Sequence, residues 1–424
     1  MKFKNPLSKQ KYYRPVANDM PGILLEILLY AACFFPFVEL YYIGSDTQPY
    51  GMLVSMVIVI LYWIRKASSS RAYIVAALAG IAMGAFAVIL IMQGGAYMAF
   101  RSYFTYLTLI MVPLATCIMM EMHGGLNEVL AKICIWIWFF CGFMQKYVQP
   151  EFGYSLLSRH TTNATRGAVS LASEPSAYGY MCIFFMLIAF RFRKNAKLYI
   201  LNLLIQVIVF ATSSVSLVYM AVYIVLYMIN ELLMRKKYSM LKTVLVAGGG
   251  IGGLMFIDKY IPASNRMGAL VELLFTNPGK ILKDESIVMR VNAITYSFQS
   301  FYENHFLPHG MSEQKIMSGI GGLFYECGFI AIIILLAIAV IIWKSYPRDT
   351  RLLYTAGFLC IMLSSIPFSS PIVGFYLGHC LYEMSKREKE KTYRAEQVEN
   401  NNGETLWYCG NLYRERKNEG FVDM

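Results

Sequence analysis

Long apolar runs recur along almost the whole chain, and this feature restricts the possible fold more than any other. A helix needs about 20 predominantly apolar residues to cross a bilayer, and runs near this length follow one another from residue 22 to residue 383. Hydrophobic residues make up 57% of the 424-residue chain and charged residues only 15%, which is too apolar for an ordinary soluble protein. We therefore predict an all-α, polytopic membrane protein. The first run is long enough to remain in the membrane, so we do not expect it to be a cleaved signal peptide.

The runs predict about twelve transmembrane helices in one integral-membrane domain, residues 1–383, followed by a polar cytoplasmic tail, residues 384–424. Only the stretch SSIPFSSP separates the last two runs, so residues 351–383 form either two spans or one span and a re-entrant segment. The predicted spans lie approximately at residues 22–43, 50–64, 72–93, 101–120, 127–147, 176–190, 198–211, 215–233, 242–258, 319–343, 351–367 and 370–383.

Loops rich in lysine and arginine alternate with loops that hold almost none, and this asymmetry predicts the orientation of the chain in the membrane. Four loops of one set each hold three or four basic residues, whereas the short loops of the other set hold none apart from Arg101 at a boundary. The N-terminal arm and the start of the tail are also basic, so both termini are expected in the cytoplasm. The net charge of +12 then faces anionic lipid headgroups and does not indicate nucleic-acid binding.

This orientation predicts that the two longest loops, about residues 148–175 and 259–318, face outward. Cytoplasmic loops of six to nine residues are too short to hold a nucleotide-binding domain, and no GxxxxGKS or GxxxxGKT motif occurs. ATP and nucleotide sugars are absent outside the cytoplasm. A bond-forming reaction there needs a donor that arrives already activated, and a lipid-linked donor fits this requirement.

The first long loop ends in the polar segment SRHTTNATRGAVSLASEPSAYG, residues 158–179. Pro175 suits the first turn of a helix, which puts Glu174 at the N-cap, where the helix dipole favours a carboxylate. Glu174 could serve as a cap alone. Arg166 lies near the apolar boundary, where an arginine snorkels, pairs with an acid such as Glu174, or binds an anion. Its planar guanidinium also matches a diphosphate well.

The second long loop contains a helical pattern of apolar residues from Ile287 to Phe301, with Arg290 near its start. The pattern predicts an interfacial helix, on which Arg290 contacts either a lipid headgroup or an anionic substrate. His305 and His309 are four residues apart, but Pro308 between them disfavours a helical metal-binding pair. No metal site and no cofactor are expected.

Four stretches resemble the polysaccharide polymerases of O-antigen and capsule assembly (Wzy-type). They are an Arg-Gly pair followed by SEPS at the start of a span, ATSSVSLVYMAVYIVLY at 211–227, an outer-loop arginine followed by LPHGMS, and SGIGGLFYECGFIA at 318–331. The resemblance runs from about Arg159 to Ala331 and includes the overall plan of spans. It depends on the order and outward placement of the four stretches together.

The resemblance implies a glycosyltransferase that joins oligosaccharide repeat units carried on polyprenyl diphosphate, at the outer face of the membrane. A flippase and a protein that sets chain length are the partner proteins it implies. Arg166 and Arg290, and more loosely Arg159, are the residues that match the family's diphosphate-binding arginines. Cations at these positions would take up charge as the bond between C1 and the diphosphate breaks.

The acceptor hydroxyl needs a base, and Glu174, His160 and His309 are the three candidates. At a helix N-terminus, Glu174 is better suited to orient the hydroxyl than to remove its proton. The related O-antigen ligases carry a histidine where this chain has Met317, which favours polymerase over ligase. A flippase or other transporter of the same lipid-linked units is the remaining alternative, and the near absence of charge inside the spans disfavours it.

Overall fold

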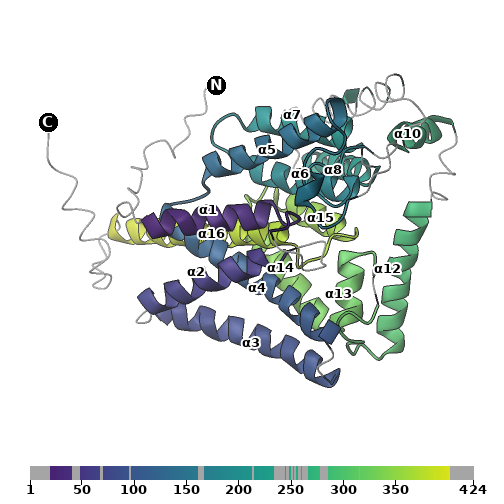
Figure 1. Cartoon of the computed structure of the whole chain (residues 1–424). Coiled ribbons are helices and arrows are strands. Elements are labelled where there is room, and N and C mark those ends of the chain that lie inside the picture. The colour runs from purple at the N-terminus through teal and green to yellow at the C-terminus, as the bar shows by residue number, and fades with distance from the viewer. Residues whose placement is uncertain are drawn as a thin grey trace, which may run out of the picture. The chain divides into compact units, whose positions relative to one another are not determined.

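The computed structural model describes residues 20–40, 48–66, 70–94, 97–160, 167–212, 214–233, 266–276, 285–314 and 316–401, with isolated positions between 244 and 259. All regular elements in this part of the chain are helices, and one isolated bridge pairs Val38 with Leu157 (Figure 1). The prediction of an all-α fold is confirmed for these residues. The chain divides into two compact units, Met1–Tyr382 and Glu383–Met424.

The helices follow the apolar runs of the sequence closely. Two segments of the described chain, Ser102–His123 and Glu128–Tyr147, are long and apolar enough to cross a membrane, judged by length and composition. The predicted span 242–258 lies outside the described residues, apart from isolated positions. The elements are α1 Met20–Phe34, α2 Tyr50–Lys66, α3 Ser70–Met92, α4 Tyr97–His123, α5 Glu128–Tyr147, the 3₁₀ turn η2 Tyr154–Leu156, α6 Pro175–Ala189, α7 Ala196–Ile205, the π-helix η3 Gln206–Ala211, α8 Ser214–Leu233, α10 Arg266–Thr276, α12 Glu285–Glu303, α13 Gly319–Cys327, α14 Ile330–Ser345, α15 Arg351–Met362 and α16 Pro371–Asn401.

Three boundaries differ from the sequence prediction or refine it. Helix α1 ends at Phe34 and does not continue to residue 43, because Pro36 disfavours helical geometry at the residue before it. The predicted single span 319–343 is two helices, α13 and α14, separated at Gly328. Residues 351–383 hold two helices, α15 and the start of α16, with residues 363–370 between them. The helix predicted over 287–301 is confirmed as α12.

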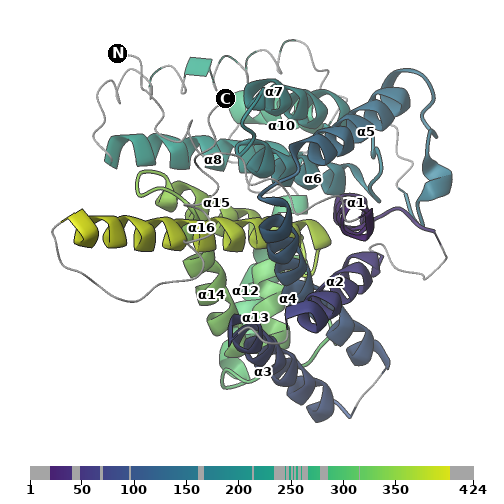
Figure 2. The ribbon, with the colours of Figure 1, turned by 90° about the vertical axis from the view of Figure 1, so that its left-hand side faces the viewer.

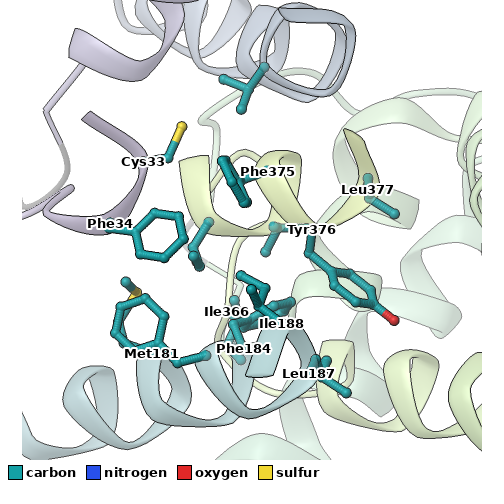
Figure 3. Close-up of a cluster of buried hydrophobic side chains, with 14 of the residues drawn as sticks. Cys33, Phe34, Met181, Phe184, Leu187, Ile188, Ile366, Phe375, Tyr376 and Leu377 are labelled. Carbon is teal, nitrogen blue, oxygen red and sulfur yellow. The ribbon is translucent and has the colours of Figure 1, made fainter. Parts of the chain in front are cut away.

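Helix α6 lies at the centre of the core. Thirteen of its fifteen residues are buried, so it is packed on all sides by other helices. Figure 3 shows Met181 and Phe184 of α6 beside Phe34 of α1 and Phe375 of α16, and the rings of Phe34 and Phe375 meet edge to face at 4.8 Å. This packing fixes the N-terminus of α6, and Glu174 with it.

Helix α4 forms a second centre of packing. It lies against α2 and α3, and Gly378 of α16 lies against Thr116 of α4 where the two helices cross (Figure 2). Helices α8 and α14 both pack on α15, and α12 packs on α13. These contacts bring the C-terminal end of α3 and the N-terminal end of α4 within reach of the segment between α12 and α13.

The segments near the helix ends fall into two sets, and the segments of each set contact one another. The first set joins segments that the lysine and arginine pattern assigns to the outer side. Its contacts are Glu39 N to Leu156 O at 2.8 Å, Ala168 N to Phe210 O at 2.8 Å, Met311 N to Gln93 Oε1 at 2.7 Å and Gly319 N to Ser364 O at 2.5 Å.

The second set joins segments that the same pattern assigns to the cytoplasmic side. Glu26 belongs to this set because it lies in the first half of α1. Its contacts are Arg193 N to Glu128 Oε1 at 2.7 Å, Arg191 Nη2 to Ser345 O at 3.3 Å, Asn230 Nδ2 to Asp349 O at 2.8 Å and His123 Nδ1 to Glu26 Oε2 at 3.5 Å.

Candidate functional site

Glu174 occupies the N-cap of α6, the position that the sequence predicts. Its backbone is extended, Pro175 lies in the first helical turn, and Tyr178 donates its backbone N–H to the Glu174 carbonyl at 3.0 Å. The half-buried carboxylate accepts the Ser176 hydroxyl at 2.6 Å and accepts no helix N–H. The capping position is therefore confirmed, while the side chain does not act as a cap. A carboxylate in this state can still accept a hydroxyl from a bound molecule.

Gln145 holds the segment before Glu174 in place. This buried side chain on α5 donates to the carbonyls of Phe152 at 2.7 Å and Ser170 at 2.8 Å. Its amide oxygen accepts the backbone N–H groups of Val169 at 3.1 Å and Ser170 at 2.6 Å. Four hydrogen bonds from one glutamine fix the loop against α5, because each loop group that it satisfies would otherwise be buried without a partner.

The segment is held on its other side by the end of η3. Gly167 has a φ of +72° and lies so close to Ala211 and Thr212 that a Cβ would overlap both. Ala168 donates its N–H to the Phe210 carbonyl at 2.8 Å. The Arg-Gly…SEPS stretch therefore contacts the ATSSVSL stretch directly, although their order in the sequence separates them by the whole of α6 and α7.

The other predicted residues of the first loop are only partly described. Arg166 lies outside the described residues, with 161–165. Arg159 is exposed. The His160 ring stacks on Tyr154 with ring centres 4.1 Å apart, and its Nδ1 is buried with no hydrogen-bond partner among the described residues. Burial, helped by the nearby Glu151 carboxylate, raises the pKa of the Tyr154 hydroxyl, which stays protonated at neutral pH.

Arg290 lies on α12, half-buried, and its charge acts on the hydroxyl of Tyr219 in α8. Tyr219 also interacts with Ser364, whose carbonyl accepts the N–H of Gly319 at 2.5 Å. Arg290 is thus positioned where the ATSSVSLVYM stretch and the start of the SGIGGLFYECG stretch approach each other. The sequence pattern predicts the helix and the position of Arg290 near its start, but it does not predict which residues of other helices lie near Arg290.

His309 lies in the segment between α12 and α13, which packs on the break between α13 and α14. Gly328 at that break has φ +56° and ψ −135°, and a Cβ on it would be 2.5 Å from the Pro308 nitrogen. His309 N donates to the Tyr325 carbonyl at 3.0 Å, and the His309 ring stacks on the Tyr325 ring at 4.4 Å. The LPHGMS and SGIGGLFYECG stretches are therefore in contact. The break at Gly328 exists because the chain at 306–308 occupies the adjacent space.

Two partly buried polar side chains that sequence reasoning missed hold the His309 segment. Gln93 at the end of α3 exchanges hydrogen bonds with the backbone N–H and carbonyl of Met311, at 2.7 and 3.3 Å. Glu326 of α13 accepts the Tyr106 hydroxyl and the Ser312 N–H. Glu326 sits inside a motif that the sequence had already singled out, so a carboxylate in an apolar stretch was the signal that could have indicated it.

A pocket of about 160 Å³ borders the His309 segment, and among the described residues that line it His309 is the one predicted member. Among the described residues, no three His, Cys, Asp or Glu side chains gather closely enough to hold a metal ion. A scan against models of known protein families matches none of them, and a search of curated proteins finds no match.

Proposed function

We propose that the chain is a multi-pass enzyme of the bacterial cytoplasmic membrane that joins polyprenyl-diphosphate-linked oligosaccharide repeat units on the outer face. The observation that carries the proposal is the pairing of the four stretches on which the family resemblance rests. Gly167 contacts Thr212, and the Pro308 region contacts Gly328. The charge of Arg290 acts on Tyr219, which belongs to the same stretch as Thr212. Stretches that belong to one site are expected to meet in this way.

Exposed apolar side chains support contact with lipid. Helix α14 buries Ile338 and Ile342 on one face and exposes Ile333, Leu336 and Val340 on another, with Leu336 62% exposed. A helix that is apolar all round and yet exposed suits a bilayer and does not suit water. Two segments in α4 and α5 also meet the length and composition of a span.

The two sets of connecting segments support the proposed sidedness. A polytopic bundle alternates its loops between two faces, so loops of one face should contact each other and not those of the other face. The contacts of both sets follow the alternation predicted from lysine and arginine. The Glu174 and His309 segments both belong to the set assigned to the outer side.

The chemistry follows from a donor that carries its own leaving group. The oxygen of an acceptor hydroxyl attacks C1 of the donor sugar, the bond between C1 and the diphosphate oxygen breaks, and the diphosphate leaves with the electron pair. Arg166 and Arg290, with Arg159, would take up the charge of the leaving diphosphate. The hydroxyl proton would pass to Glu174, His160 or His309.

Arginine substitutions in cells that depend on this chain for their surface glycan test the proposal. Losing a charge-assisted contact that strengthens in the transition state reduces the rate by about 30- to 1,000-fold. Arg166→Ala, Arg166→Lys and Arg290→Ala should therefore leave single repeat units in place of long chains. Arg348→Ala, on an exposed residue of the predicted cytoplasmic side, is the matched control. The readouts are glycan length by gel and protein level by immunoblot.

Glu174→Gln separates a catalytic carboxylate from a purely structural one. The amide keeps an acceptor for the Ser176 hydroxyl but loses the charge. Long polymer in well-expressed Arg166→Ala and Arg290→Ala cells would contradict the assigned site. Full-length polymer in Glu174→Gln cells alone would remove Glu174 from the list of bases and leave the two histidines.

A further inference from the structure

A pocket of about 160 Å³ lies between the end of α3 and the segment that carries His309. At about 30 Å³ for each water molecule this space holds about five waters, which is too small for a drug-sized ligand but suits one ring. Its lining residues are Ile89, Met92, Gln93, Pro308, His309, Gly310 and Glu313.

The segment around the pocket is both strained and firmly held. Three of its non-glycine residues have positive φ angles, His305 at 52°, Phe306 at 65° and Ser312 at 60°. Strained backbone of this kind persists where surrounding structure enforces it, and it concentrates at functional sites. The hydrogen bonds from Gln93 and Glu326 supply that enforcement, because both side chains bond to the segment's backbone.

The groups at the pocket match the two kinds of surface that a sugar ring presents. Glu313 and His309 both line the pocket and bring a carboxylate and an imidazole ring to it, and both groups can bond to sugar hydroxyls. Ile89 and Met92 offer an apolar wall to the C–H face of a ring.

The pocket is connected to α12 several residues beyond Arg290. Rings of His309, Tyr325 and Tyr296 stack in sequence, at 4.4 and 6.1 Å between successive centres. Tyr296 follows Arg290 by six residues, or about 9 Å along the axis of α12. A glycan whose diphosphate lies at Arg290 would therefore reach the pocket with a sugar residue further along its chain, and not with the diphosphate or the sugar that carries it.

We propose that this pocket binds one sugar residue of the lipid-linked glycan, remote from the diphosphate, with Glu313 and His309 as the groups that bind its hydroxyls. The inference rests on the proposed function and adds a specificity subsite to it. Glu326 is a positioning residue for this subsite, because it bonds to the segment and does not line the pocket, whereas Gln93 bonds to the segment and also lines the pocket.

Photo-crosslinking tests the subsite directly. A diazirine amino acid in place of Met92, which is 68% exposed at the pocket's edge, should crosslink to glycan in cells that make the polymer. The same amino acid in place of Ile333, on the exposed face of α14, is the control. The product is purified and stained for protein and for carbohydrate. A glycan-bearing band at position 92 and none at 333 supports the subsite. Polymer made by the position-92 protein without any glycan crosslink overturns it.

A matched pair of glutamate variants provides the second test. Glu313→Gln should lower the rate of chain extension by about 10- to 100-fold, the loss expected when a charged hydrogen-bonding group at a binding site is neutralised. Glu303→Gln, an exposed glutamate that accepts Gln299 Nε2 at 2.8 Å, should extend chains normally. Equal rates for the two variants would overturn the role of Glu313.

Failure of the subsite and failure of the proposed function give different results. If deletion of the chain leaves polymer length unchanged, the polymerase function fails, whatever the crosslink shows. If polymer depends on the chain but position 92 does not label glycan, the subsite fails alone.

Discussion

Replacing Gln145 with methionine should detach the segment that leads to Glu174. Methionine keeps a similar shape but removes four hydrogen bonds, a partly buried one to Phe152 and three buried ones, to Val169 and twice to Ser170. Each such bond contributes about 0.5–1.5 kcal/mol net, so the free energy of unfolding should fall by about 2–6 kcal/mol. The backbone groups left buried without partners favour the upper half of that range.

The measurement is unfolding of the purified protein by sodium dodecyl sulfate in mixed micelles, compared with glycan length in cells. Gln149→Met is the matched control, since Gln149 lies four residues later and its side chain is exposed. We expect a lower unfolding midpoint and short glycans for Gln145→Met, and neither effect for the control. Equal midpoints for the two variants would refute the claim that Gln145 fixes this segment.

Three further predictions follow from other parts of the fold. Reporters fused after residue 196, 238 or 347 should be cytoplasmic, and reporters fused within 148–175 or 262–315 should be external. A cytoplasmic reporter in either long loop would contradict a reaction on the outer face. Polymerisation by purified enzyme should survive EDTA, whereas loss of activity restored by Mg²⁺ or Mn²⁺ would require a metal site. Gly328→Ala should destabilise the His309 segment by about 1–3 kcal/mol and speed its proteolysis, because a Cβ there is strained and meets Pro308. Gly322→Ala, where a Cβ meets only Ile316 at 3.8 Å, should leave the rate of cleavage unchanged, and equal cleavage of both variants would contradict the close contact at Gly328.

Apolar periodicity and proline signals predicted the helices well, since both depend on local sequence. Pro175 and Glu174 read correctly as the start of α6, and the apolar spacing of 287–301 read correctly as a helix. The sequence did not predict the break at Gly328, because the break depends on contact with a segment 20 residues earlier in the chain. A glycine in an apolar run gives no local sign of that contact.

The candidate site was only partly predictable for the same reason. Types of residue that suit diphosphate and hydroxyl chemistry could be recognised along the chain, but their neighbours could not. Gln145, Gln93 and Glu326 hold the two segments through contacts with distant backbone, and local spacing does not predict such contacts, even for Glu326, which lies inside a recognised stretch. The sequence prediction also assigned the histidines and arginines to one site. In the structure, His309 is connected through Tyr325 to Tyr296, which lies six residues after Arg290 on α12.

The most direct test of the central claim is polymerisation by the purified chain in liposomes, with defined polyprenyl-diphosphate-linked repeat units as the substrate. We predict a ladder of products that differ by one repeat unit, formed without nucleotide, and its loss in folded Arg290→Ala protein. Repeat units that remain single in the presence of folded wild-type chain would contradict the account.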